Sequence, residues 1–182
     1  DRIRASGVLP AAAASFLDRP DADPDLLFRN ECAQPLLCLH QMLVWEVVGP
    51  LLPTPEIVAG YSLGELSAYG CAGALRPEDV VRLAAVRGRL MSAAAAVPQT
   101  MAAVVGLRRD RLERVCAGFA AEIAVVNGSD HFVCGLPLDR AGAFLEACAA
   151  AGARRTVRLP VAAASHTSFM KDAADAFAGF LR

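Results

Sequence analysis

Apolar residues recur with helical spacing in two segments of the first half of the chain. Residues 35–48 carry one such stripe, with Pro35 at the expected first turn, where a missing N–H costs nothing. The stripe consists of Leu36, His40, Leu43 and Val47, widened by Leu37, Val44 and Val48. Residues 77–96 repeat the spacing, and the positions predicted to be buried are Val80, Leu83, Ala84, Arg87, Leu90 and Met91. Both segments are therefore predicted to be helices.

Shorter elements are expected around these helices. Prolines at positions 10, 20 and 24 predict a loop-rich stretch over residues 1–30. Residues 57–59 are Ile-Val-Ala and are expected to form a short strand. A helix over residues 63–71 is expected to follow.

From residue 101 the pattern changes to alternating strands and helices. The expected strands cover residues 101–106, 122–126, 131–134 and 154–159, and the expected helices cover 109–118 and 138–151. This βαββαβ order is that of a ferredoxin-like unit. Candidate catalytic residues lie on both sides of it. We therefore interpret residues 99–159 as a ferredoxin-like subdomain inserted into an α/β core of residues 1–98 and 160–182.

Composition and charge exclude several classes of protein. Hydrophobic residues make up 55% and charged residues 20%, which excludes a disordered chain. The net charge of −1 leaves no broad basic surface for nucleic acid. No apolar run approaches the ~18 residues of a membrane span, and no secretory signal follows the N-terminus. We expect a soluble, cytoplasmic protein without nucleic-acid or membrane partners.

The six cysteines form no C-x-x-C pair and are expected to be reduced core residues. With three histidines and no clustered carboxylates, no metal site is predicted.

The pentapeptide Gly60-Tyr61-Ser62-Leu63-Gly64 fits a nucleophile elbow. Its position between an expected strand and an expected helix is the context that such an elbow requires. The tight turn lifts the Ser62 hydroxyl above the sheet, and the glycines on both sides permit backbone crowding that a β-carbon would block. The Leu63 N–H then points at an oxyanion forming on a substrate. The alternative is a glycine-rich turn with an idle serine.

A serine nucleophile needs a base, and three histidines are candidates. His40 lies on an apolar stripe and is expected in a core or groove, whereas His131 lies beside a hairpin turn and is expected to be exposed. His166 lies in a loop after a strand, where catalytic residues collect in open α/β sheets. We predict that His166 is the base. The alternative is a helix-capping loop built on Ser165, Thr167 and Ser168.

Arg87 is the third candidate, because helical spacing points its charge inward while Arg82 and Arg89 fall on the solvated face. An inward guanidinium needs a partner, and its planar fork suits a carboxylate. The alternative is a structural ion pair with an Asp or Glu of the core.

Several segments together resemble the malonyl-CoA:acyl-carrier-protein transacylase family, which also includes acyltransferase domains of fatty-acid and polyketide synthases. They are Ala33-Gln34-Pro35-Leu36-Leu37, Ala59-Gly60-Tyr61-Ser62-Leu63-Gly64-Glu65-Leu66-Ser67-Ala68, Val86-Arg87-Gly88-Arg89-Leu90-Met91, Met101-Ala102-Ala103-Val104-Val105-Gly106-Leu107, Ala149-Ala150-Ala151-Gly152-Ala153, Pro160-Val161 and Ser165-His166.

The resemblance implies an α/β-hydrolase-like core interrupted by a ferredoxin-like subdomain. It implies that Ser62 is the nucleophile and that His166 is the general base and acid. Arg87 would clamp the free carboxylate of a malonyl group, Leu63 would supply one oxyanion-hole N–H, and Gln34 would lie near the active site. The implied substrate is malonyl-CoA, the implied partner is the phosphopantetheine arm of an acyl carrier protein, and no bound cofactor is implied.

The chain departs from the family pattern in three places. Tyr61 stands where the family usually has His. An elbow with Tyr at this position resembles that of the malonyltransferase subunits of malonate decarboxylase systems. Residues 163–166 match no family signature of acyl selectivity. The family's N-terminal Gly-Gln-Gly segment and C-terminal third have no counterpart, so we expect the chain to be the middle of a longer protein.

Two other functions fit parts of the sequence. A serine esterase or thioesterase needs an acid between Ser62 and His166, but Asp110, Asp130 and Asp139 all fall in the inserted subdomain. A non-catalytic module that docks a carrier protein is the other alternative.

Overall fold

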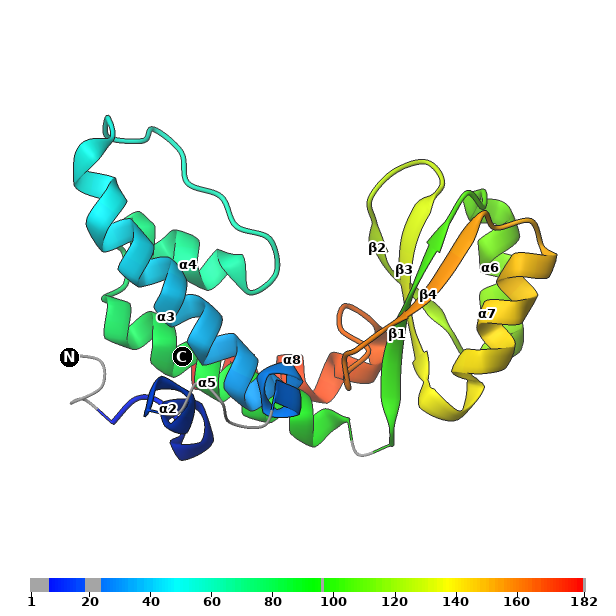
Figure 1. Ribbon diagram of the computed structural model, residues 1–182, viewed down its shortest axis with the longest axis horizontal. Coiled ribbons are helices and arrows are strands. Elements are labelled where there is room, and N and C mark those ends of the chain that lie inside the picture. The colour runs from blue at the N-terminus through cyan, green and yellow to red at the C-terminus, as the bar shows by residue number, and fades with distance from the viewer. Residues whose placement is uncertain (1–6, 19–23, 96, 182) are drawn as a thin grey trace. The chain divides into compact units, whose positions relative to one another are not determined.

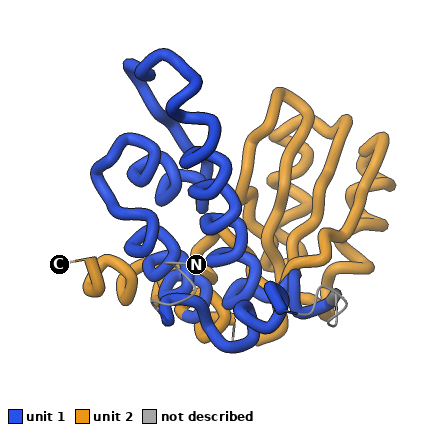
Figure 2. The backbone as a smooth tube through the Cα atoms, turned by 60° about the vertical axis from the view of Figure 1, so that its left-hand side comes forward, with its two compact units in different colours: residues 1–89 blue, residues 90–182 orange. Residues whose placement is uncertain are grey.

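The computed structural model describes residues 7–18, 24–95 and 97–181. The chain divides into two compact units, Asp1–Arg89 and Leu90–Arg182, which are coloured separately in Figure 2. Pro20 and the expected end of a helix at residue 96 lie outside the described residues. The two units are described in turn.

The described part of unit 1 contains helices and connecting loops (Figure 1). The elements are α2 (Ala11–Asp18), η1 (Pro24–Phe28), α3 (Asn30–Val48), η2 (Gly49–Leu51), α4 (Gly64–Cys71) and α5 (Pro77–Ala94), which continues into unit 2. The expected helices over residues 63–71 and 77–96 are confirmed within two residues at the described ends. The loop-rich expectation for residues 1–30 is wrong over α2, where successive alanines favour a helix.

Helix α3 differs from the prediction in its start and in the face that it buries. It begins at Asn30, so Pro35 lies inside the helix. The buried residues are Cys32, Gln34, Pro35, Cys38, Leu39 and Met42. His40, expected in a core or groove, is exposed. The predicted stripe is largely exposed too, and we call Leu37, Leu43, Val44, Val47 and Val48 the apolar face of α3. Spacing identified an apolar face, but packing against α2, η1 and α4 buries the other one.

The expected strand over residues 57–59 is wrong. These residues form an extended loop, and the Ile57 side chain is 85% exposed. A strand exists only where a neighbouring strand supplies hydrogen-bond partners, and no described residue pairs with this segment.

Unit 2 is built on a four-stranded antiparallel sheet. The strands are β1 (Gln99–Val105), β2 (Glu122–Val126), β3 (His131–Pro137) and β4 (Arg155–Leu159), in the spatial order β2-β3-β1-β4. β1 pairs with β3 in the register Ala102↔Cys134 and with β4 in the register Ala103↔Val157. All four expected strands are therefore confirmed. Helices α6 (Arg109–Phe119), α7 (Ala141–Ala150) and α8 (Lys171–Phe180), with the short turns η3 (Leu138–Arg140) and η4 (Ser168–Met170), complete the unit.

The core of unit 2 follows from strand alternation. Ala102 and Val104 of β1 and Phe132, Cys134 and Leu136 of β3 are two residues apart, so they share one face of the sheet. Helices α6 and α7 cover that face (Figure 1), and Leu112, Cys116, Phe144 and Cys148 complete the cluster. A second cluster joins Met91 at the end of α5 to Ala163, Met170 and Ala173. The loop after β4 is thereby packed into this unit.

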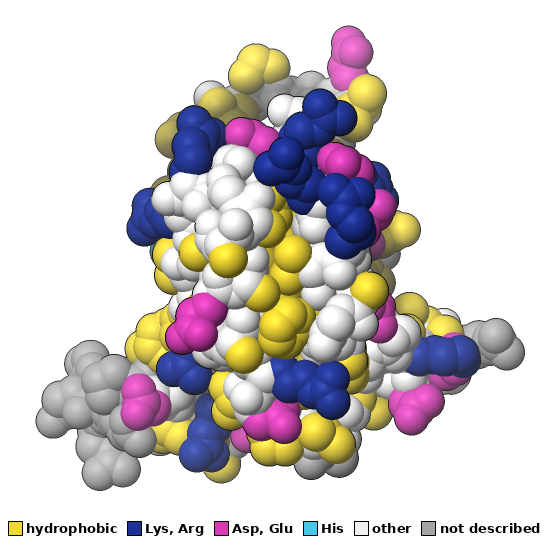
Figure 3. All heavy atoms as spheres, turned by 90° about the vertical axis from the view of Figure 1, so that its right-hand side faces the viewer, with side chains coloured by type: hydrophobic (Ala, Val, Ile, Leu, Met, Phe, Trp, Pro, Cys, Tyr) yellow, Lys and Arg dark blue, Asp and Glu magenta, His cyan; other side chains and the backbone are white. Residues whose placement is uncertain are grey.

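The face of unit 2 shown in Figure 3 carries basic and acidic side chains close together. On α6, Arg109 pairs with Glu113 and Arg114 with Asp110, and Arg108, just before the helix, also pairs with Asp110. All six cysteines are free thiols, as expected; five of them are buried, but Cys71 is only half-buried. No helix in the described ranges is both long and apolar enough to cross a bilayer.

Candidate functional site

Ser62 lies on a tight turn into α4 and has the positive φ of a nucleophile elbow, although a loop stands where the strand before it was expected. Its φ is 53°, in the left-handed region that non-glycine residues rarely occupy. The Gly64 N–H donates to the Tyr61 carbonyl at 2.9 Å and the Glu65 N–H to the Ser62 carbonyl at 3.2 Å, so the chain turns directly into α4. The Leu63 N–H donates to no group of the described residues. The turn therefore projects the Ser62 hydroxyl, with the Leu63 N–H next to it in the chain.

The two glycines of the pentapeptide have different roles. A β-carbon on Gly60 would lie 2.0 Å from the Gly64 carbonyl oxygen and 2.4 Å from the Glu65 nitrogen, so only glycine fits there. A β-carbon on Gly64 would meet nothing within 4 Å. The expectation that both glycines relieve crowding is confirmed for Gly60 and wrong for Gly64.

Arg87 of α5 reaches the Ser62 hydroxyl. Its Nη2 donates to Ser62 Oγ at 3.2 Å, and its Nη1 donates to Gln34 Oε1 of α3 at 2.7 Å. Gln34 is buried, and its Nε2 donates to Asn30 Oδ1 at 3.2 Å. That bond turns the amide oxygen of Gln34 toward Arg87. Three of the predicted site residues, Ser62, Arg87 and Gln34, thus form one hydrogen-bonded chain.

Gly88 explains how α5 comes close enough for this contact. A β-carbon there would lie 2.4 Å from the Asn30 carbonyl oxygen, so α5 crosses the start of α3 in backbone contact. Asn30 was not among the predicted site residues. Its spacing of four from Gln34 is the signal that indicates a same-face amide pair on a helix.

The charge of Arg87 has no carboxylate partner among the described residues. The structural ion pair considered as an alternative is therefore absent there. Burial lowers the pKa of the Arg87 guanidinium, and the charge of Glu65 partly opposes that shift. An arginine pKa starts far above neutrality, so the group stays positive. A half-buried cation held by neutral oxygens is suited to binding an anionic group beside Ser62.

Contacts with α3 hold helix α4 in place. The buried Ser67 donates its hydroxyl hydrogen to Gln41 Oε1 at 2.5 Å and lies 3.5 Å from Cys38 Sγ, both on α3. A β-carbon on Gly70 would lie 2.5 Å from Met42 Sδ, so α3 and α4 pack closely there. These contacts, which sequence reasoning missed, fix the helix that follows the elbow.

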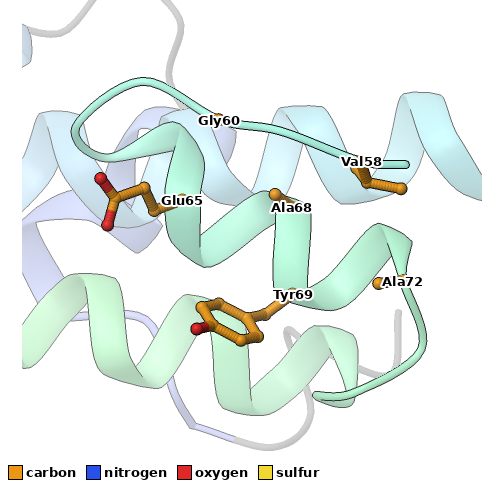
Figure 4. A pocket seen from close by; sticks show the side chains of 6 residues that line it. All are labelled: Val58, Gly60, Glu65, Ala68, Tyr69 and Ala72. Atoms are coloured by element: carbon orange, nitrogen blue, oxygen red, sulfur yellow. The ribbon is translucent and has the colours of Figure 1, made fainter.

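Two hollows flank the segment that leads into the elbow. One, of about 370 Å³, lies between Val58–Gly60 and α4, with Glu65 on the first turn and Tyr69 one turn further along (Figure 4). The other, of about 480 Å³, is lined by Leu37, Gln41, Tyr61, Leu63 and Ser67 among others. The elbow is therefore accessible from its surroundings.

His166 belongs to unit 2, where it lies in the loop between β4 and η4, as predicted. It is exposed, and its φ of 61° is again in the left-handed region. The residue before η4 is Thr167, whose side chain makes no capping bond to that turn and donates instead to the Ala164 carbonyl at 2.5 Å. The helix-capping alternative for this loop is therefore wrong for Thr167.

A family model described as "Acyl transferase domain" matches residues 20–181. The malonyl CoA-acyl carrier protein transacylase of Escherichia coli K12 is 40% identical over 146 residues, which is 74% of this chain and 45% of that protein. The mycoketide-CoA synthase of Mycobacterium tuberculosis is 34% identical over 156 residues, or 86% of this chain and 4% of that protein. The chain thus spans about half the length of the transacylase that it matches.

Solved structures resemble the whole chain. The malonyl-CoA:acyl carrier protein transacylase of Xanthomonas oryzae has a TM-score of 0.83 and 31% identity, covering 99% of this chain and 60% of that one. A malonyl-transacylase solved in complex with a type II polyketide synthase acyl-carrier protein has a TM-score of 0.81 and 28% identity, covering 100% of this chain and 62% of that one.

Proposed function

Because the chain belongs to the acyl transferase domain family, we propose that it moves a malonyl group from CoA to the phosphopantetheine thiol of an acyl carrier protein through an acyl-Ser62 intermediate. The names of its relatives support this substrate and partner. The observation that carries the proposal is the Arg87 guanidinium, which donates to Ser62 Oγ and has no carboxylate partner in the described part of unit 1.

In the first half-reaction, His166 takes the proton of the Ser62 hydroxyl as Oγ attacks the thioester carbonyl of malonyl-CoA. The Leu63 N–H donates to the resulting oxyanion, which is the group that preorganised donors stabilise most. When the intermediate collapses, the C–S bond breaks. The CoA sulfur leaves with the proton from His166, and malonyl-Ser62 remains.

The second half-reaction reverses these roles. His166 takes the proton of the carrier thiol, and the thiolate attacks the malonyl-serine carbonyl. Collapse of the second intermediate breaks the C–Oγ bond, and His166 returns its proton to Ser62. The two half-reactions change no oxidation state and use only the serine hydroxyl, the imidazole and the two thiols, so no cofactor is part of this proposal.

Arg87 selects the acyl group in this proposal. The malonyl carboxylate accepts from the guanidinium in two parallel bonds, which a planar fork favours. A neutral acetyl group would leave that half-buried cation without an anion. Gln34, oriented by Asn30, holds the guanidinium from its other side.

The fold proposal has the same boundaries as the sequence prediction. Residues 99–159 form a ferredoxin-like subdomain, supported by the element order βαββαβ and the sheet order β2-β3-β1-β4. Residues 1–98 and 160–182 belong to an α/β-hydrolase-like core, supported by the left-handed Ser62 on a turn into α4. A cytoplasmic location is part of this proposal.

The direct test is transfer of labelled malonyl from CoA to a phosphopantetheinylated carrier protein by the whole gene product. Wild type should label the carrier, and Ser62→Ala and His166→Ala should each lower the rate by at least about 10³-fold. Release of free malonate at the wild-type rate, with no labelled carrier, would identify a hydrolase instead. No reaction of wild type with either acceptor would contradict catalysis and favour a docking module.

A further inference from the structure

The loop that carries His166 is tied to three strands of the unit 2 sheet. Gln99 lies in β1, Glu122 is the first residue of β2, and Gly135 lies in β3. We infer that Gln99 and Glu122 are positioning residues that hold His166 in the backbone conformation needed by the base. This inference rests on the proposed role of His166.

Gln99 holds the incoming end of the loop. Its side chain is 5% exposed, and its Oε1 accepts a hydrogen bond from the Ala164 N–H at 3.0 Å. Its Nε2 lies 3.5 Å from the Ala94 carbonyl oxygen at the end of α5 and donates to it. Ala163 and Ala164 are 1% and 0% exposed, so the Ala164 N–H is a buried donor that needs the Gln99 oxygen as its acceptor.

Glu122 holds the outgoing end. Its Oε2 accepts from the Ser168 N–H at 2.8 Å, and its Oε1 accepts from the Ser168 hydroxyl. Ser168 is the first residue of η4, where backbone N–H groups lack partners within the turn. A carboxylate that accepts from both donors makes two charge-assisted bonds, which are stronger than neutral ones.

The close approach at Gly135 completes the attachment. A β-carbon there would lie 2.7 Å from Ala164 Cβ and 2.8 Å from Thr167 Cγ2. Thr167 Oγ1 also donates to the Ala164 carbonyl, closing the loop on itself. His166 lies at the middle of residues 164–168, between the two ends tied to Gln99 and Glu122.

These contacts matter because the His166 backbone is in an unfavourable region. A histidine with a φ of 61° returns to an ordinary conformation unless its neighbours are held. Such a return rotates the imidazole away from its working direction. Small errors in the placement of a catalytic group cost large factors in rate.

The test compares Glu122→Ala, Glu122→Gln and Glu146→Ala in the whole gene product. Glu146 is exposed on α7. Glu146→Ala therefore removes one negative charge from unit 2, as Glu122→Ala does, at a position outside the His166 loop. Glu122→Ala should slow formation of malonyl-Ser62 about tenfold while leaving the KM for malonyl-CoA within about twofold. Glu122→Gln keeps an acceptor oxygen for Ser168 and should recover most of the rate. Glu146→Ala should match wild type.

An NMR measurement tests the same inference without catalysis. The imidazole and backbone resonances of His166 should be single in wild type and in Glu146→Ala. In Glu122→Ala they should split or broaden as the loop samples a second backbone conformation. Unchanged His166 resonances together with a wild-type rate in Glu122→Ala would overturn the inference, as would equal losses in Glu146→Ala. If wild type forms no acyl-enzyme, the proposed function fails, and the resonances alone then decide whether Glu122 holds the loop.

Discussion

At the scale of single residues, Ser62 and His166 share an uncommon backbone conformation. Both have a positive φ, 53° and 61°, and a non-glycine residue in that region costs about 1–3 kcal/mol. Neighbouring contacts hold the backbone in this conformation and offset its cost. They lie at Gly60 for the elbow and at Gln99 and Glu122 for the loop of His166. Strained backbone of this kind is concentrated at functional sites, which supports the proposed roles of both residues.

Arg87→Ala should lower the preference for malonyl-CoA over acetyl-CoA by about 10- to 100-fold, since a hydrogen-bonded pair involving a charged group contributes about 1.5–3 kcal/mol. The measurement is the ratio of kcat/KM for the two thioesters. The exposed Arg89 on the same helix is the matched control, and Arg89→Ala should keep the ratio. A malonyl preference that persists in Arg87→Ala would contradict the assigned role.

Gly60→Ala and Gly64→Ala form a second matched pair. The first places a methyl group 2.0 Å from a backbone oxygen and should lower the free energy of unfolding by about 1–3 kcal/mol or more. The second places it in open space at the start of α4 and should be neutral or stabilising by up to about 1 kcal/mol. Urea denaturation measures both. Equal effects of the two changes would show that the elbow geometry is wrong.

At the scale of elements, prediction from sequence succeeded where local pattern decides. The strands and helices between Gln99 and Leu159 were predicted closely, because each has its own period and its own turn residues. Prediction from sequence failed where the outcome depends on which other segment of the chain packs against an element. Whether residues 57–59 form a strand depends on a neighbouring strand, and which face α3 buries depends on what packs against it.

The candidate site shows the same division. Helical spacing alone pointed Arg87 inward, and the pentapeptide in its expected context before a helix pointed to Ser62. The spacing of four between Asn30 and Gln34 on α3 already indicates their hydrogen bond. The bonds of Arg87 to Ser62 and to Gln34 depend instead on the crossing of α3 and α5 at Gly88. No local pattern encodes that crossing.

The core of unit 2 gives a prediction at this scale. Phe144 of α7 is fully buried, and its ring meets that of Phe119 edge to face at 5.8 Å. Phe144→Ala should lower the free energy of unfolding by about 3–5 kcal/mol, measured by chemical denaturation. Leu138→Ala, at a side chain that is 38% exposed, should cost clearly less. If both changes cost the same, this core is wrongly assigned.

At the scale of the whole molecule, unit 1 presents large apolar side chains to solvent. Val47, Leu51 and Ile57 are 70%, 79% and 85% exposed. Large apolar side chains that are this exposed favour association where they come together on a surface. The combined change Val47→Ser, Leu51→Ser and Ile57→Ser should therefore reduce self-association of the 182-residue chain in sedimentation velocity.

The same triple variant should change the free energy of unfolding by little, about 0.5 kcal/mol per position or less, because the three side chains are already in water. Met42→Ser, at a side chain that is 3% exposed on the opposite face of α3, should destabilise the chain instead. A triple variant as unstable as Met42→Ser would mean that the exposed face is buried in solution.

In the proposed function, Ser62 accepts a malonyl group that Arg87 selects by the free carboxylate of that group. The most direct measurement is intact-protein mass spectrometry of the whole gene product after brief, separate exposure to malonyl-CoA and acetyl-CoA. Wild type should show a malonyl adduct and far less acetyl adduct, and Ser62→Ala should show neither. Absence of any adduct from the folded wild-type protein, or an equal malonyl adduct in Ser62→Ala, would contradict the proposed function.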